Sequence, residues 1–267
     1  GLLIMDKKEL LQILNIIGFA ATVIVNFLAV LLPLAGNTTQ QLSDDLPNLF
    51  VPAGITFSIW TFIYIFLGLF SIYQIRDIFK TDKIEMKYLD DIGYFFIIGS
   101  IANVTWIFLW HYKLVPLSLV FMIILLLSLI MIYLRLKIGK SEVSRIEKVA
   151  VHVPFSIYLG WITVATIANV TAVIVDIGLN GFGWPEEAFF GLLPVALTIL
   201  VIIVAVLITI AMILLRRDFV YSLVIIWALL GIFIKQFTSN ITVGITALVS
   251  SIVILIGIIY MIIKKNK

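Results

Sequence analysis

The sequence predicts an all-α, polytopic transmembrane helical bundle. Of its 267 residues, 63% are hydrophobic and 12% are charged, about half the charged fraction of an ordinary soluble domain. Apolar runs of about 20 residues recur with short polar breaks, and this is the length at which a helix crosses a bilayer. Membrane β-strands are much shorter and alternate in polarity, so a β-barrel is excluded.

We expect eight membrane spans from these runs. Their approximate ranges are residues 10–34, 53–75, 91–110, 114–136, 149–175, 188–214, 219–235 and 241–263. With the N-terminus inside, 16 of the 18 Lys and Arg residues lie on the cytoplasmic side, and only Lys113 and Lys235 lie outside. Because cytoplasmic loops carry the excess of basic residues, the sequence predicts a multi-pass protein of the cell membrane with both termini cytoplasmic.

The composition also restricts the chemistry. There are no cysteines and only two histidines, which argues against disulfides, thiolate catalysis and a metal site. No P-loop, Ser-His-Asp arrangement, paired carboxylates or zinc motif is present, so nothing positive indicates an enzyme or a resident cofactor. The net charge of +3 reflects membrane topology. The expected partners are therefore the lipid bilayer and a small hydrophobic ligand, and no nucleic acid.

Three of the expected helices carry aromatic or amide side chains at spacings of three and four, which places each set on one helical face. The sets are Phe57, Trp60, Tyr64 and Gly68; Asn103, Trp106 and Trp110; and Tyr158, Trp161, Ala165 and Asn169. At 1.5 Å per residue Trp60 lies about 10 Å deep, similar to the outer halves of the other two helices. We infer an aromatic-walled pocket open to the outer side, below the loop 35–52.

Two amides lie within identical pentapeptides, Ile101–Thr105 and Ile167–Thr171. An amide in hydrocarbon needs partners, so Asn103 and Asn169 indicate helices that face one another around a shared polar spot. The alternative is that each amide only joins helices, typically for less than about 1 kcal/mol.

Other features also allow two interpretations. Loops as long as 35–52 are often lids, but this one fits a solvated connector equally well. Trp184 and Trp110 fit interfacial anchors as well as functional residues. Trp60 and Trp161 are too deep for anchors, which leaves packing or ligand contact.

At these stripes the chain resembles the TspO/MBR family, the tryptophan-rich sensory proteins related to the mitochondrial translocator protein. The matching segments are Phe57–Tyr64 with Gly68, Ala102–Trp106, and Tyr158–Asn169. They are similar to the family patterns W-T-x-x-Y-x-x-x-G, L-N-x-x-W and Y-x-x-W…A-T-x-x-N, in the same order. The resemblance covers roughly residues 10–176. It departs at Ser58, where the family has proline, and the proposed cholesterol motif is absent.

The resemblance implies a five-helix TspO-like unit over residues 6–176, followed by a region of about three additional transmembrane helices over 177–267. It also implies a pocket for tetrapyrroles such as porphyrin or haem and for drug-like molecules, capped by the loop after the first helix. By carry-over, Trp60, Asn103, Trp106, Trp161 and Asn169 line this pocket. Family members are often dimers, but the extra helices can cover that interface, so a monomer and a homodimer are both expected.

The leading hypothesis is a membrane receptor or sensor that binds a flat hydrophobic ligand, with a tetrapyrrole as first candidate. The alternatives are a transporter or permease accessory, and a light-dependent porphyrin-modifying protein that would use Trp60 and Trp161. The predicted ligand-binding residues are Phe57, Trp60, Tyr64, Asn103, Trp106, Trp110, Tyr158, Trp161 and Asn169.

Overall fold

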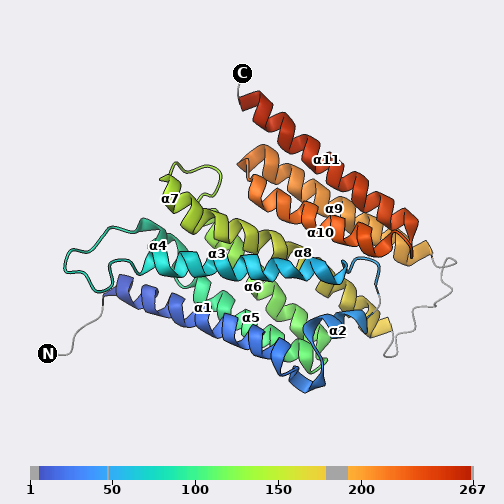
Figure 1. Cartoon of the computed structure of the whole chain (residues 1–267), viewed down its shortest axis with the longest axis horizontal. Coiled ribbons are helices and arrows are strands. Elements are labelled where there is room, and N and C mark those ends of the chain that lie inside the picture. The colour runs from blue at the N-terminus through green and yellow to red at the C-terminus, as the bar shows by residue number, and fades with distance from the viewer. Residues whose placement is uncertain (1–5, 47, 179–191, 266–267) are drawn as a thin grey trace.

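The computed structural model (Figure 1) describes residues 6–46, 48–178 and 192–265, and these residues contain helices and no strands. The eight long apolar helices are α1 (Lys7–Leu31), α3 (Ile59–Gln74), α5 (Phe95–His111), α6 (Val115–Arg135), α8 (Val153–Ile177), α9 (Leu192–Arg216), α10 (Phe219–Gln236) and α11 (Ile241–Lys265). Their ends lie within four residues of the eight expected spans, except that α3 begins six residues after the expected start.

Seven helical segments of the described chain are long and apolar enough to cross a membrane, with α3 counted as part of the segment Gly54–Gln74. Helix α5, with 17 residues, is shorter than these seven segments. Their outward faces expose large apolar side chains such as Ile72 and Leu207. Such faces require a lipid environment, because exposed apolar surface of this extent is unfavourable in water. The predicted polytopic helical bundle is therefore confirmed.

Short elements connect the spans. They are η1 (Leu34–Gly36), α2 (Thr39–Asp44), η2 (Gly54–Ser58), α4 (Lys87–Ile92), α7 (Arg145–Glu147) and the π-helical turn η3 (Lys148–His152). Helix α2 lies within the loop 35–52 and begins with a capping box, in which Thr38 and Gln41 satisfy each other's backbone N–H groups. Trp184, which the sequence analysis considered as a membrane-surface anchor, lies outside the described residues.

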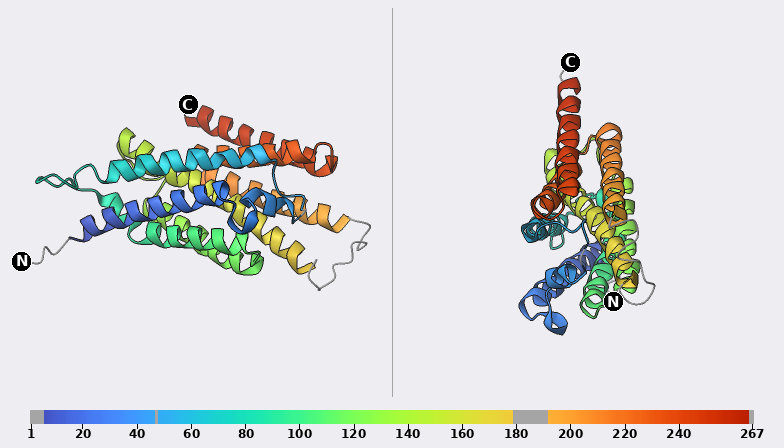
Figure 2. Two further views of the ribbon diagram at one scale, coloured as in Figure 1. Left: turned by 60° about the horizontal axis from the view of Figure 1, so that its bottom comes forward. Right: turned by 90° about the vertical axis from the view of Figure 1, so that its right-hand side faces the viewer.

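Five helices form a closed ring. Around it, α1 packs on α5, α5 on α6, α6 on α8, α8 on α3, and α3 again on α1. Phe70, Phe96 and Phe155 meet edge to face inside the ring, with centroids 5.1–5.9 Å apart. The helices run roughly parallel to the long axis of the molecule, as Figure 2 shows. The ring is built from the first five long helices of the described chain.

The other three helices lie together beside the ring (Figure 1), with α10 between α8 and the pair α9 and α11. Gly160 allows the close approach, because a Cβ atom there would come within 3.0 Å of Val224 on α10. Asp218, at the start of α10, joins the two groups of helices. It accepts hydrogen bonds from the hydroxyls of Tyr133 (2.9 Å) and Ser156 (2.7 Å) and from the Tyr221 N–H (3.0 Å).

The end of the ring at which α1 begins is held by a buried carboxylate. Asp77 follows α3 and accepts hydrogen bonds from Lys8, from Gln12 Nε2 (2.9 Å) and from the Ile84 N–H (2.7 Å). Burial alone would raise the pKa of Asp77, but these donors outweigh it and hold the pKa well below its usual range. The connection between α3 and α4 is thereby fixed to α1.

Candidate functional site

A small cavity of about 60 Å³ lies at the opposite end of the ring. Residues 38–46 and 48–58, which we call the roof segment, cover it, and its walls come from α3, α5 and α8. Six of the nine predicted ligand-binding residues line it: Phe57, Trp60, Trp106, Trp110, Trp161 and Asn169. The three faces that the sequence spacing identified therefore converge on one space.

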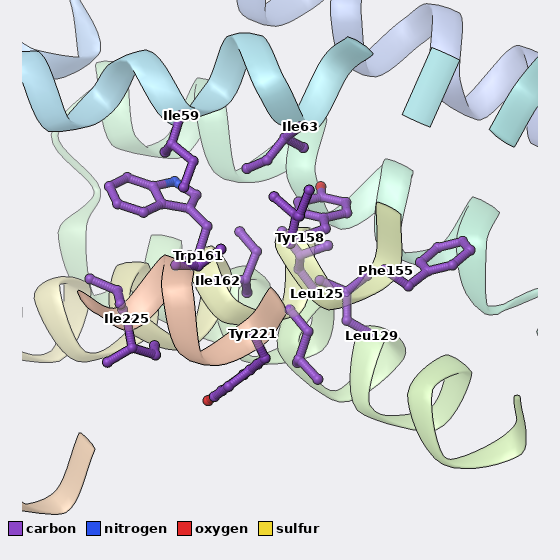
Figure 3. Close-up of a cluster of buried hydrophobic side chains, with 14 of the residues drawn as sticks. Ile59, Ile63, Leu125, Leu129, Phe155, Tyr158, Trp161, Ile162, Tyr221 and Ile225 are labelled. Carbon is purple, nitrogen blue, oxygen red and sulfur yellow. The ribbon is translucent and has the colours of Figure 1, made fainter. Parts of the chain in front are cut away.

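One side of the cavity is a cluster of rings from η2, α3 and α8. The Trp161 indole is met edge-on by Phe57 at 5.7 Å and by Trp60 at 6.3 Å. Figure 3 shows the Trp161 ring projecting from α8 toward Ile59 of α3. Such edge-to-face contacts fix ring orientations and stabilise each pair by about 0.5–1.5 kcal/mol beyond burial.

The opposite side is formed by α5. Trp106 and Trp110 are one turn apart and stack with centroids 5.7 Å apart and planes 21° apart. Trp110 also donates its indole N–H to the carbonyl of Thr39 in the roof segment (3.2 Å), and it is only 6% exposed. Trp110 is thus buried beneath the roof segment in this structure, where a membrane-surface anchor would be exposed.

The two amides belong to separate hydrogen-bond networks, not to one shared polar spot. Asn169 accepts from the Trp106 indole N–H (2.8 Å) and donates to Ser118 Oγ (3.2 Å), which joins α8 to α5 and α6. Its carboxamide therefore sets the orientation of the Trp106 ring on the cavity wall.

The second network lies below the cavity. Asn103 accepts from Asn26 Nδ2 (2.8 Å) and donates to the Tyr158 hydroxyl (3.0 Å), so it joins α5 to α1 and α8. Tyr64 and Tyr158 lie against Trp60, with centroids 5.7 and 6.2 Å away. Asn103, Tyr64 and Tyr158 are thus the three predicted residues that do not line the cavity, and they support the residues that do.

Sequence reasoning did not single out several lining residues. Four come from the roof segment (Thr39, Ser43, Val51 and Pro52) and two from α8 (Val164 and Ala168). Ala165 belongs to the helical face predicted from the sequence and also lines the cavity, and Ala168 lies seven residues after Trp161, so the helical spacing could have indicated it as well. The roof residues have no periodic signal, and only the length of their loop pointed to the site.

The roof segment is packed onto the protein, unlike a solvated connector. Leu42, Phe50 and Val51 are at most 3% exposed. His111 Nδ1 lies 2.7 Å from the Ile107 carbonyl and must carry its proton there, which leaves Nε2 to accept from the Thr39 hydroxyl at 3.4 Å. The loop that was predicted as either a lid or a connector therefore covers the cavity.

The chemistry of the cavity is apolar and aromatic. None of its lining side chains is ionisable, and the described residues contain no cluster of metal-binding side chains. Three tryptophans of the cavity wall are buried. The indole N–H groups of Trp106 and Trp110 have hydrogen-bond acceptors, but the indole N–H of Trp161 has none in the described chain. This arrangement suits the binding of a flat apolar molecule.

Fold and site together define a polytopic helical membrane protein with an aromatic-lined cavity at one end of a five-helix ring. The family model described as TSPO-like protein matches residues 12–260. The chain belongs to this TSPO-like family. The match includes α9, α10 and most of α11, beyond the roughly 10–176 over which the sequence motifs resemble the family. No curated protein and no solved structure matches the chain.

Proposed function

We propose that this protein is a membrane receptor or sensor for a flat hydrophobic ligand, with a tetrapyrrole as the first candidate. The observation that carries the proposal is the cavity itself, enclosed by four tryptophans and a phenylalanine and free of ionisable side chains. Aromatic faces stack on a planar conjugated ligand, and an apolar lining makes its transfer from the membrane favourable. Membership of the TSPO-like family supports the same assignment.

The cavity must enlarge for such a ligand to enter. Its volume of about 60 Å³ holds a few water molecules, whereas pockets for drug-sized ligands measure roughly 300–1,000 Å³. The ring helices are held to one another by buried hydrogen bonds, but the roof segment lies at the surface of the bundle. Displacement of the roof segment is therefore the movement that admits ligand.

The polar groups at the cavity narrow the ligand class. The unpaired Trp161 N–H needs an acceptor, so the ligand should present an oxygen or nitrogen lone pair at one edge. Because no lining side chain is cationic, a ligand carboxylate would remain unpaired unless it stayed at the cavity mouth. We therefore expect the dimethyl ester of protoporphyrin IX to bind at least as tightly as the free diacid.

We place the protein in the cell membrane with both termini in the cytoplasm, so that the cavity opens toward the outside. The skew of 16 of 18 basic residues to one side supports this orientation. The alternation of the eight helices supports it as well, since an even number of spans returns the chain to the side on which it began.

The test is a titration of the purified protein with protoporphyrin IX and its dimethyl ester, followed by quenching of tryptophan fluorescence. Trp161→Phe keeps most of the ring packing and breaks no protein hydrogen bond, so it should weaken binding about tenfold, the value of one buried hydrogen bond. Trp184→Phe serves as the matched control and should leave affinity unchanged. Non-saturating quenching, or equal effects of both substitutions, would contradict the proposal.

A transporter is the second candidate, and one feature of α1 favours it. Buried polar side chains follow one face of this helix along most of its length: Gln12, Asn15, Thr22 and Asn26. The side-chain oxygens of Gln12, Asn15 and Thr22 have no partner in the described chain. Uptake of the porphyrin ester into proteoliposomes, compared with protein-free vesicles, separates transport from binding alone.

A further inference from the structure

One face of α10 contacts the backbone of the roof segment at successive turns. Trp227 donates its indole N–H to the Thr56 carbonyl (2.9 Å), and the Gly231 carbonyl accepts the Ala53 N–H (3.0 Å). Both bonds involve backbone groups of the roof segment, so they fix the position of its main chain. Residues four apart lie on one side of a helix, which makes the contacts continuous.

The same face continues to the end of α10. Gln236 Nε2 donates to the Leu49 carbonyl (3.3 Å), and Lys235 pairs with Asp44 (3.3 Å). The ion pair is partly exposed and contributes little, but Gln236 is only 3% exposed, so its bond is shielded from water. We call Trp227, Gly231, Lys235 and Gln236 the latch face.

Gly231 shows that the latch face fits the roof segment closely. A Cβ atom at this position would overlap Thr56 Oγ1 and come within 2.9 Å of Pro52 Cβ. Any larger side chain therefore forces the roof segment away from α10. Here a glycine is required for close approach of two backbones and not for an unusual φ angle.

These bonds hold the part of the roof segment that closes the cavity. Val51, Pro52 and Phe57 line the cavity, and the residues bonded to Trp227 and Gly231 lie among them. The earlier part of the roof segment is bonded to α5 through Trp110 and His111, and the partly exposed pair of Lys235 with Asp44 also reaches it from α10. The second half of the cover thus depends on a helix outside the ring.

We propose that α10 is the element that sets access to the cavity: the latch face holds residues 48–58 closed, and loss of its contacts opens the cavity. The task of the three C-terminal helices is then to control entry of ligand into the five-helix ring. This inference rests on the proposed function for its biological meaning, but the opening itself is measurable without ligand.

The experiment uses the absence of native cysteine. Val164 lines the cavity and is 3% exposed, so Val164→Cys reports opening through its rate of reaction with a small water-soluble maleimide. Gly231→Ala should raise this rate at least tenfold, equivalent to about 1.4 kcal/mol. Gly257→Ala is the matched control, because a Cβ there meets only the flexible ends of Ile210 and Ile213; it should leave the rate unchanged.

A second reporter separates local opening from general unfolding. Ile213 is fully buried in α9, away from the roof segment. The rate at which Ile213→Cys reacts with the maleimide should therefore not change when Gly231→Ala is added. If Gly231→Ala fails to fold, Trp227→Phe is the second variant. It removes the hydrogen bond to the Thr56 carbonyl but keeps an aromatic side chain at this position. It should accelerate labelling of Val164→Cys about three- to tenfold.

The outcomes distinguish this inference from the proposed function. If neither Gly231→Ala nor Trp227→Phe changes the labelling rate of Val164→Cys by more than twofold, the proposal that the latch face holds the cavity closed is wrong, whether or not porphyrin binds. Equal acceleration at both reporters overturns it too, because the protein is then loosened everywhere. Accelerated labelling at Val164→Cys alone, in a protein that never binds porphyrin, supports the latch and contradicts the proposed ligand.

Discussion

The five-helix ring and the three C-terminal helices are held together by different means. In the ring, polar side chains reach from one helix to another, as Asn103 and Asn169 do. In the described part of α9, α10 and α11, the hydroxyls of Thr209 and Ser251 donate to carbonyls one turn earlier in their own helix, and no side-chain hydrogen bond joins two of these three helices. Small residues such as Ala205, Ala247 and Gly257 allow these helices to pack closely instead.

The difference indicates where exact geometry matters. A hydrogen bond between helices in hydrocarbon fixes their register and rotation, because sliding would leave both groups unpaired. Apolar packing tolerates small shifts at lower cost. The cavity is therefore built among helices joined to one another by hydrogen bonds, whereas α10, which contacts the roof segment, packs on α9 and α11 through apolar contacts.

The largest expected effect is at the connection between the two regions. Asp218→Ala leaves the hydroxyls of Tyr133 and Ser156 and the N-terminus of α10 without their acceptor, which should cost about 3 kcal/mol. We expect thermal unfolding of the purified protein in detergent to occur at lower temperature and to separate into two transitions. Asp218→Asn, which keeps an acceptor, is the milder control. A single transition with an unchanged midpoint would show that Asp218 does not couple the regions.

The next effect contrasts the two regions directly. Asn103→Leu removes two bonds between helices and leaves Asn26 and Tyr158 partly unpaired, so it should destabilise the protein by about 1–3 kcal/mol. Thr209→Val removes a buried hydroxyl that bonds only within α9, and should cost less than about 0.5 kcal/mol. Reversible unfolding in mixed micelles measures both. Equal costs would remove the distinction between the regions.

A smaller effect concerns pH. The depressed pKa of Asp77 means that its charged form stabilises the ring above the ordinary value of 3.8, and this stabilisation is lost as pH falls below that value. Hydrogen exchange at pH 6 and pH 3 should therefore show loosening of residues 76–86 and of the start of α1 at low pH. Asp77→Asn should show a similar loosening already at pH 6. Identical exchange of wild type and variant at pH 6 would contradict this role.

Much of the fold was predictable because membrane insertion leaves a strong signal. Each span must be apolar over its whole length, and the aromatic stripes keep helical spacing, so α3, α5 and α8 could be located and their inner faces identified. Most of the cavity wall followed from these faces.

The remaining features depend on contacts distant in sequence. Asn103 and Asn169 could be recognised as buried amides, but their partners Asn26 and Ser118 lie on other helices and have no motif of their own. Helix α2 and the contact of Gly231 with Thr56 were also not predictable, since a glycine in an apolar run carries no sign of the loop that packs on it. The division into a TspO-like unit and an additional region remains a prediction of the sequence.

The central claim is that a flat ligand occupies the cavity beneath the roof segment. Its most direct test is protection of Ala168→Cys, a cavity-lining position, from maleimide by protoporphyrin IX dimethyl ester, with the exposed Glu142→Cys at the other end of the bundle as control. We expect saturable protection of at least fivefold at Ala168→Cys and none at Glu142→Cys. If fluorescence quenching saturates while Ala168→Cys reacts at its original rate, the ligand binds elsewhere and the claim is wrong.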